Sequence, residues 1–190
     1  MSYTLTMKKI DIFLQRERIK TTIPYIQNGM SVLDIGCSNG ELFELYREKD
    51  IEISGIGLDP DIESDIIKKN YQLIKDSFPS SKVSGTFDVI TALAVLEHIS
   101  DEKIDEFIYS CKKHLKANGK VIITVPHPFV DTILKVLIFL KIIDGMEAEQ
   151  HHGFDIQRVA GLFEKCGFNL LKHKRFQFGM NNLFVFSGKY

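Results

Sequence analysis

The sequence predicts an α/β protein in which a mainly parallel sheet is covered by helices on both faces. Short apolar segments alternate with segments of helical periodicity along most of the 190 residues, as expected for parallel strands joined by crossover helices. Three of the apolar segments stop at Gly36, at Asp59-Pro60 and at Pro126, residues that favour turns. Near the C-terminus, two β-rich segments flank residues 179–182, which predicts a hairpin and therefore one antiparallel strand.

In the first part of the chain, residues 3–25 are expected to form one or two polar helices. Residues 32–35 are a short apolar run that predicts a strand, and residues 41–49 carry an apolar face with helical spacing. Residues 51–58 alternate as a strand and end at Asp59. This strand, loop and helix order begins a parallel α/β unit.

In the middle of the chain, residues 61–74 follow an acidic first turn and are expected to be a helix. Residues 75–86 are rich in serine and predict a loop, and residues 87–93 a buried strand. A helix is expected over residues 101–116 and another buried strand over residues 120–125. These elements extend the sheet on the other side of the first strand.

In the last part, residues 129–143 are unusually apolar and are expected to be helical. Asp155 can cap a helix that ends at Gly167. Residues 168–178 and 183–189 are the two expected strands of the hairpin. Ligands of such sheets bind at the carboxyl ends of the strands, so the chemistry is expected in the loops at that edge.

Length and composition fit one domain over residues 1–190. A formal net charge of -1 gives no reason to expect a nucleic-acid partner. The three cysteines are an odd number with no C-x-x-C pair, which favours reduced thiols and a cytoplasmic protein. Residues 129–143 are too few to span a membrane, which needs about 20 apolar residues. No secretory signal is expected at the N-terminus.

The glycine loop from Gly36 to Gly40 joins the first clear strand to a helix and allows three interpretations. A dinucleotide site needs G-x-G-x-x-G, and here Ser38 separates the two glycines. A nucleophile elbow has the form G-x-S-x-G, which fits, but such elbows follow several earlier strands. An adenosine-plus-amino-acid site suits Asp34 in front of the loop, because a carboxylate attracts sulfonium and ammonium groups. A purely structural turn is the remaining alternative.

A second acidic residue strengthens the third interpretation. Asp59 ends the next strand, where a carboxylate can accept hydrogen bonds from both ribose hydroxyls. Asp59-Pro60-Asp61 is also a sequence typical of a turn and helix cap. Asp34 and Asp59 on either side of one glycine loop favour a nucleoside ligand.

At this point the sequence resembles the class I S-adenosylmethionine-dependent methyltransferases, and most closely the small-molecule subgroup of type 11, 12 or 23 domains. The resemblance covers about residues 30–189. It rests on segments that follow in the family's order: VLDIGCSNG (32–40), GLDP (57–60), Asp76-Ser77, FDVITALAVLEHI (87–99), HLKANGKVIITVP (114–126) and FEKCGFNLLKH (163–173). Ser38 stands where the family usually has glycine.

The resemblance implies a Rossmann-like, seven-stranded sheet of order 3-2-1-4-5-7-6 with strand 7 antiparallel. It implies S-adenosyl-L-methionine as the cofactor, with Asp59 on the ribose, Asp76 and Ser77 at the adenine, and the Ala92 carbonyl at the ammonium group. The full set expected at the cofactor is Asp34, Gly36, Cys37, Ser38, Gly40, Asp59, Pro60, Asp76, Ser77 and Ala92. It also implies an acceptor-side insertion over residues 127–153. Residues 1–28, which precede the resemblance, are expected to be an N-terminal helical segment.

A hydroxyl acceptor can require a general base, and histidine titrates near neutral pH. His98, His151 and His152 are the candidates, with His127 as a fourth, and each can instead be a surface or capping histidine. The spacing of His127, His151, His152 and Glu147 matches no standard metal site, so no metal is expected.

The acceptor is expected to be a small molecule, by elimination. Thr91 to Ala94 lack the Asp/Asn-Pro-Pro-aromatic sequence of enzymes that methylate exocyclic amines of DNA, and the chain has no Pro-Cys. The apolar segment 129–143 can be core, a lid over a hydrophobic acceptor or a dimer surface, so the protein is expected to be a monomer or a homodimer. Two other functions stay open: a non-catalytic binding module with this fold, and a nicotinamide-dependent oxidoreductase.

Overall fold

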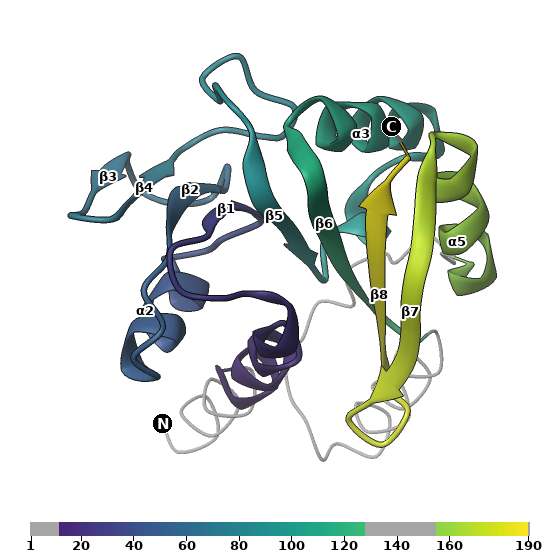
Figure 1. The fold of residues 1–190 in the computed structure, drawn as a ribbon, viewed down its shortest axis with the longest axis horizontal. Coiled ribbons are helices and arrows are strands. Elements are labelled where there is room, and N and C mark those ends of the chain that lie inside the picture. The colour runs from purple at the N-terminus through teal and green to yellow at the C-terminus, as the bar shows by residue number, and fades with distance from the viewer. Residues whose placement is uncertain (1–11, 128–154, 190) are drawn as a thin grey trace, which may run out of the picture.

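An eight-stranded sheet forms the centre of the protein in a computed structural model that describes residues 12–127 and 155–189 (Figure 1). The strands are β1 (Ser31–Ile35), β2 (Ser54–Leu58), β3 (Ile66–Ile67), β4 (Tyr71–Ile74), β5 (Phe87–Leu93), β6 (Leu115–Pro126), β7 (Phe168–Phe176) and β8 (Asn181–Gly188). The helices are residues 12–20, η1 (Ile23–Tyr25), α2 (Glu41–Glu48), η2 (Leu96–His98), α3 (Asp101–Lys113) and α5 (Ile156–Lys165). The expected helix over residues 129–143 lies outside the described residues.

The strand order is β3-β4-β2-β1-β5-β6-β8-β7. Strands β4, β2, β1, β5 and β6 are parallel, and β8 is antiparallel to both of its neighbours. Without β3, this is the expected order 3-2-1-4-5-7-6 with the seventh strand antiparallel, so the predicted α/β fold is confirmed. The expected number of strands was one too low, because the two-residue β3 pairs antiparallel with β4 at the edge.

The prediction of a helix over residues 61–74 is wrong, because this segment contains the strands β3 and β4. Strand β4 pairs with β2, from Gly55 opposite Tyr71 to Leu58 opposite Ile74. The Tyr71 ring stacks on Phe43 of α2 with centroids 4.4 Å apart. Pairing and packing with distant residues therefore outweigh the local signals for a helix.

The boundary between α3 and β6 also differs from the prediction. The helix ends at Lys113 rather than at residue 116, and β6 begins at Leu115 rather than at residue 120. The Phe87 N–H donates to the His114 carbonyl at 2.8 Å, and Leu115 lies opposite Phe87. Contact with β5 therefore starts the strand early, and a bulge follows before Lys120 pairs with Val89.

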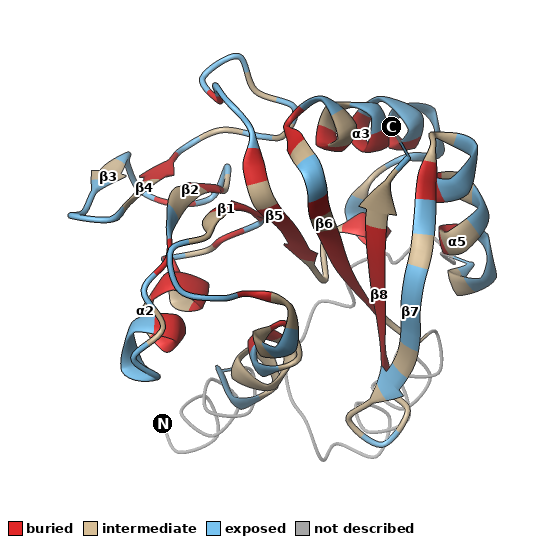
Figure 2. Ribbon diagram, in the orientation of Figure 1, coloured by how far each residue is buried: buried red, intermediate tan, exposed pale blue. Residues whose placement is uncertain are grey.

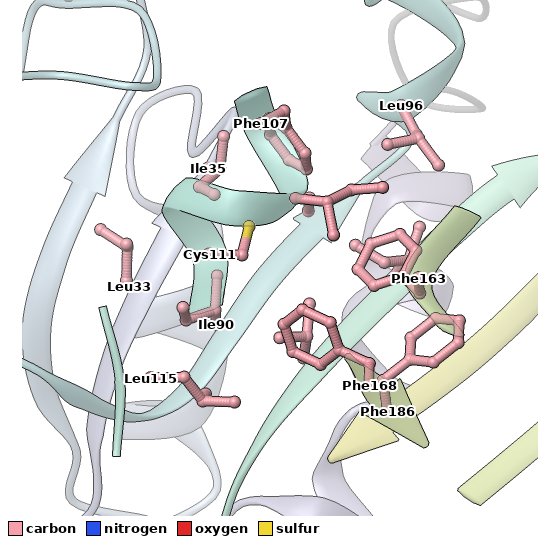
Figure 3. Close-up of a cluster of buried hydrophobic side chains, with 14 of the residues drawn as sticks. Leu33, Ile35, Ile90, Leu96, Phe107, Cys111, Leu115, Phe163, Phe168 and Phe186 are labelled. Carbon is pink, nitrogen blue, oxygen red and sulfur yellow. The ribbon is translucent and has the colours of Figure 1, made fainter. Parts of the chain in front are cut away.

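Helices cover both faces of the sheet, as predicted. Along β1, Val32 belongs to the apolar cluster formed with α2 and the helix of residues 12–20, whereas Leu33 belongs to the cluster formed with α3 and α5. Figure 2 shows the buried residues concentrated in the central strands and on the inner sides of the helices. In the second cluster, Phe163 of α5 stacks on Phe186 of β8 with centroids 4.2 Å apart (Figure 3).

Among the residues that the structure describes, no helix has both the length and the apolar character to cross a membrane.

Candidate functional site

The glycine loop after β1 lies at the carboxyl edge of the sheet and is held against β2. The N–H groups of Gly36 and Cys37 both donate to the Leu58 carbonyl, at 2.8 and 3.1 Å. Gly36 has φ +73°, and a Cβ there would lie 2.5 Å from Cγ2 of Val95. Both the left-handed backbone and the close approach therefore require glycine.

Asp59 fixes the other half of the loop. Its carboxylate accepts a hydrogen bond from the Ser38 N–H at 2.8 Å and another from the Asp61 N–H at 2.9 Å. Ser38 itself has φ +49°, so a non-glycine residue holds the left-handed conformation with the help of this bond. Each carboxylate oxygen retains a further lone pair, which leaves Asp59 able to accept from ligand hydroxyls.

A cavity of about 600 Å³, here called the helix-side cavity, lies between this loop and the helix of residues 12–20. From the predicted set it contains Asp34, Gly36 and Cys37. Its other lining residues are Ile12, Leu14, Gln15, Arg18, Ile19, Asn39, Glu41, Leu42 and Leu93. The wall is thus a mixture of apolar and polar groups, with Arg18, Asp34 and Glu41 as its charged residues. Polar groups at defined places in a cavity can fix the orientation of a small molecule.

Asp34 is one of the three charged residues that line this cavity, with Arg18 and Glu41. It is 4% exposed and accepts a hydrogen bond from Oγ1 of Thr91 at 2.7 Å. Burial raises the pKa of its carboxyl to about 7, against the hydrogen bond from Thr91, and the carboxylates of Glu41 and Asp59 raise it further. A cationic ligand group beside Asp34 would restore its ionised form.

Cys37 is a structural residue. Burial raises the pKa of its thiol far above the ordinary value, so the thiolate nucleophile is not available. Its side chain packs on β2, where a Cβ at Gly57 would lie 2.7 Å from the sulfur. The main chain of Ser38 is held by Asp59. The Ser38 hydroxyl forms no hydrogen bond with a base among residues 12–127 and 155–189, so the nucleophile-elbow interpretation gains no support.

A second cavity of about 410 Å³, the loop-side cavity, opens on the other side of Gly36. Pro60, Asp76 and Ser77 from the predicted set line it, together with Phe78 and other residues. Asp76 accepts from the Ser77 N–H at 2.9 Å and from Oγ of Ser80 at 2.7 Å. These bonds, the one from Ser80 first, lower the pKa of Asp76 and keep it ionised.

The remaining predicted residues have different positions. Gly40 is buried and precedes α2 with φ +86°, and Ala92 is fully buried within β5, where the next residue, Leu93, lines the helix-side cavity. His98 lines the loop-side cavity, and the His127 N–H donates to the Met180 carbonyl at 2.7 Å. His151 and His152 lie outside the described residues.

Several site residues were not found from the sequence. Arg18 and Leu14 come from a helix whose docking over the glycine loop depends on tertiary contacts, such as the buried 2.7 Å bond between Thr22 and Tyr46. At the start of β8, Oδ1 of Asn181 and Nδ2 of Asn182 are buried without a hydrogen-bond partner within the described part of the chain. The only sequence signal for these two residues is that two consecutive asparagines precede the apolar residues 183–186 of the strand.

A larger cavity, of about 810 Å³, lies elsewhere, at the amino ends of β1, β2 and β4. Its wall includes Tyr71, whose hydroxyl donates to Glu44 at 2.7 Å, and Arg47, which is paired with the same glutamate. Glu44 is therefore already bonded by Tyr71 and Arg47 of the same wall. None of the residues predicted to bind the cofactor lines this cavity. Among the described residues, no three His, Cys, Asp or Glu side chains are grouped to hold a metal ion.

Comparison with known proteins agrees with this geometry. A family model described as a methyltransferase domain matches residues 10–173. A ubiquinone biosynthesis O-methyltransferase from Glaesserella parasuis is 29% identical over 139 residues, which cover 67% of this chain and 58% of that protein. One from Idiomarina loihiensis is 31% identical over 105 residues, covering 49% and 41%. The chain thus spans about half the length of the curated relatives it matches.

Solved structures share the fold. A TehB-like SAM-dependent methyltransferase from Corynebacterium glutamicum superimposes with a TM-score of 0.64 and 14% sequence identity. The match covers 90% of this chain and 87% of that one. At this identity the likeness concerns the architecture alone.

Proposed function

Since this chain belongs to the methyltransferase-domain family, we propose that it is an enzyme that transfers the methyl group of S-adenosylmethionine to a small-molecule hydroxyl. One observation carries the proposal. Two cavities meet at Gly36, and carboxylates stand on both sides of it, with Asp34 in the helix-side cavity and Asp76 in the loop-side cavity. This distribution of charge suits a ligand with a cationic amino-acid end and an adenosine end.

The residues fit this cofactor one by one. Gly36 lines both cavities, so a ligand that lies along its main chain would reach from one cavity to the other. Asp34 would accept from the ammonium group and Arg18 would face the carboxylate, because both line the helix-side cavity. Asp59 would accept from the ribose hydroxyls and Asp76 from the adenine amino group. The Ala92 carbonyl remains a proposed partner of the ammonium group.

S-adenosylmethionine supplies a methyl group that is already bonded to a positively charged sulfur, so the protein needs to contribute mainly positioning and a dry site. Ile12, Leu14, Ile19 and Leu93 supply the apolar part of the wall of the helix-side cavity, against which the cofactor would displace water. A buried Asp34 holds a compensating negative charge where the cationic end is bound. This separates the chain from nicotinamide enzymes, because the same carboxylate would repel a pyrophosphate.

The acceptor would approach from the β5, β6 and β8 side of the helix-side cavity. Oδ1 of Asn181 can accept a hydrogen bond, and it is a buried polar atom that a bound hydroxyl would satisfy. His98, His127, His151 and His152 are the proposed general bases. The relatives named for O-methylation support a hydroxyl over an amine.

We further propose one domain over residues 1–190, acting as a monomer or homodimer in the cytoplasm, with a hydrophobic acceptor. Cys37, Cys111 and Cys166 are all free thiols, which suits a reducing compartment. The proposed acceptor-side insertion, residues 127–153, falls almost wholly outside the described residues.

Thermal unfolding with added S-adenosylhomocysteine tests the proposal. A ligand at 100 times its dissociation constant stabilises the folded state by about 2.7 kcal/mol, which is a clear rise in melting temperature. Turnover is then measured with 3,4-dihydroxybenzoate as a probe hydroxyl acceptor. A shift with NADH and none with S-adenosylhomocysteine would refute the cofactor assignment. Cofactor binding without turnover on a panel of hydroxyl compounds would favour the non-catalytic module.

A further inference from the structure

The turn between β7 and β8 presents an aromatic side chain that the fold does not account for. Phe178 has a relative exposure of 103%, so its ring is open to solvent on all sides. Its backbone also has φ +56°, a conformation that disfavours a bulky side chain. Glycine or asparagine would adopt this backbone conformation with less strain and would expose no phenyl ring to water. The presence of phenylalanine therefore indicates that the ring itself has a role.

Two further exposed apolar side chains are close to this turn. Nε2 of Gln177 donates to the Leu14 carbonyl at 3.1 Å, which joins the turn to the helix of residues 12–20. Phe13, beside Leu14, is 60% exposed, and Ile12 is 52% exposed. Both elements are drawn in Figure 1, the helix in purple and the turn in yellow at the lower end of β7 and β8.

The strand that leads to the turn is basic. From Phe168 to Tyr190 the chain has four Lys or Arg residues and no Asp or Glu, although the whole chain carries 24 basic and 25 acidic residues. Lys172 and Lys174 lie on one face of β7 and Arg175 on the other, and none of the three forms an ion pair in the part of the chain that the structure describes. Lysines on an edge strand also prevent strand pairing, but that role does not explain Phe178.

We propose that Ile12, Phe13, Phe178 and the two lysines on one face of β7, Lys172 and Lys174, form a docking surface for an anionic lipid bilayer. Apolar and aromatic side chains beside lysines that are not engaged in ion pairs are the combination that binds the interface of such a membrane. An acidic protein would be attracted by the same lysines. An acidic protein partner would not explain why the Phe178 ring is completely exposed at the end of the turn, whereas a bilayer interface would bury this ring.

The position of this surface has a consequence for the acceptor, which rests on the proposed function. The β7–β8 turn lies at the carboxyl edge of the sheet, beside the end of β6, where Pro126 is opposite Asn181. Ile12 both belongs to the docking surface and lines the helix-side cavity. A docked molecule would therefore hold the mouth of this cavity against the bilayer, which suits an amphiphilic acceptor dissolved in the membrane.

Flotation of the full-length chain with lipid vesicles tests the proposal. Vesicles of phosphatidylcholine alone are compared with vesicles that also contain about 30% phosphatidylglycerol, at about 0.1 and 0.5 M salt. Phe178→Asn removes the ring and fits the backbone, and its control is Ile67→Ser, at a side chain 85% exposed on β3. Lys172→Gln/Lys174→Gln is matched by Lys68→Gln/Lys69→Gln on the loop before β4.

The wild type is expected to float only with anionic vesicles at low salt. Phe178→Asn should weaken binding about tenfold while leaving the melting temperature unchanged or higher, because the strained backbone is relieved. The lysine pair should lose about fivefold per charge, and both control variants should bind as the wild type does. Failure of the wild type to float with anionic vesicles, or equal binding by Phe178→Asn and Ile67→Ser, overturns the proposal. Affinity for S-adenosylhomocysteine, measured in parallel, tests the cofactor assignment separately.

Discussion

Replacing Asp34 by asparagine should make the cofactor-free protein more stable and its cofactor site weaker. Asp34 is buried at 4% exposure, and its carboxyl has a pKa of about 7 in the folded state against 3.8 in the unfolded chain. Asparagine has nearly the same shape, and its Oδ1 can still accept the hydrogen bond from Thr91. The substitution therefore removes a charge and leaves the packing in place.

The sign and size of this change in the free energy of unfolding follow from the proton that Asp34 binds. Between pH 3.8 and about 7 only the folded state holds the Asp34 proton, so the free energy of unfolding falls as the pH rises through this window. At about 1.4 kcal/mol per unit, the loss is at most about 4 kcal/mol and is complete above pH 7. The asparagine variant has no proton to lose at this position and keeps its stability through the window. The difference between the two proteins should thus be small near pH 4 and about 2–4 kcal/mol in favour of Asp34→Asn at pH 8.

A bound cationic ligand favours the wild type over Asp34→Asn. The ammonium group of S-adenosylhomocysteine favours ionised Asp34, so binding should release a proton below pH 7 and weaken about tenfold between pH 8 and pH 6. Asp34→Asn should bind at least about thirtyfold more weakly, for loss of a charged partner of about 2 kcal/mol.

Urea unfolding from pH 5 to pH 8 and calorimetry with S-adenosylhomocysteine measure both effects. Asp88→Asn is the control with the opposite sign. Burial acts to raise the Asp88 pKa, but Lys116 and Ser31 bond its carboxylate and leave that pKa lowered. This control should lose stability at neutral pH. The reasoning fails if Asp34→Asn is less stable than the wild type at pH 8, or if wild-type affinity does not change between pH 6 and 8.

Two other substitutions test the glycine loop. Asp59→Ala should weaken S-adenosylhomocysteine binding by about 2–4 kcal/mol, since two hydrogen bonds to a charged acceptor are lost; a calorimetric affinity within about twofold of the wild type would exclude its ribose role. Gly36→Ala should lower the free energy of unfolding by about 2–4 kcal/mol, from a left-handed φ and the overlap with Val95. In the double variant, Val95→Ala should restore the part of the free energy of unfolding that is lost through this overlap. If the two substitutions change the free energy of unfolding in urea additively, the two residues do not touch.

The glycine loop was the best-predicted part of the molecule, because its signals are local. A strand, a left-handed Gly36 and a helix start are all encoded within the segment VLDIGCSNG, and Asp59 at the end of the next strand follows the same pattern. The roles assigned to these residues at the cofactor stay predictions, supported by the two cavities. Local sequence therefore specified this loop and its position at the carboxyl edge.

The errors lie where distant residues decide the structure. Residues 61–74 carry an acidic turn typical of a helix start, yet Tyr71 to Ile74 form a strand because β2 offers a free edge. Leu115 pairs with Phe87 across 28 positions, which shortens α3. Arg18 reaches the helix-side cavity only because its helix docks on α2. None of these contacts has a signature in the neighbouring sequence.

The central position of β1 also bears on how the chain acquires its fold. Strand β1 needs β2 on one side and β5 on the other, and its pairing with β5 joins residues 57 positions apart, as in Val32 and Val89. The hairpin of β7 and β8 closes through a turn of four residues. Since distant pairings form late, we expect the C-terminal hairpin to assemble early. The pairings of β6 with β8, such as Lys120 with Ser187, and of β1 with β5 join distant residues and should form late, so the glycine loop gains its final shape late as well. During synthesis, the nucleoside site would stay unformed until β5 has left the ribosome, although every glycine of the loop is made long before.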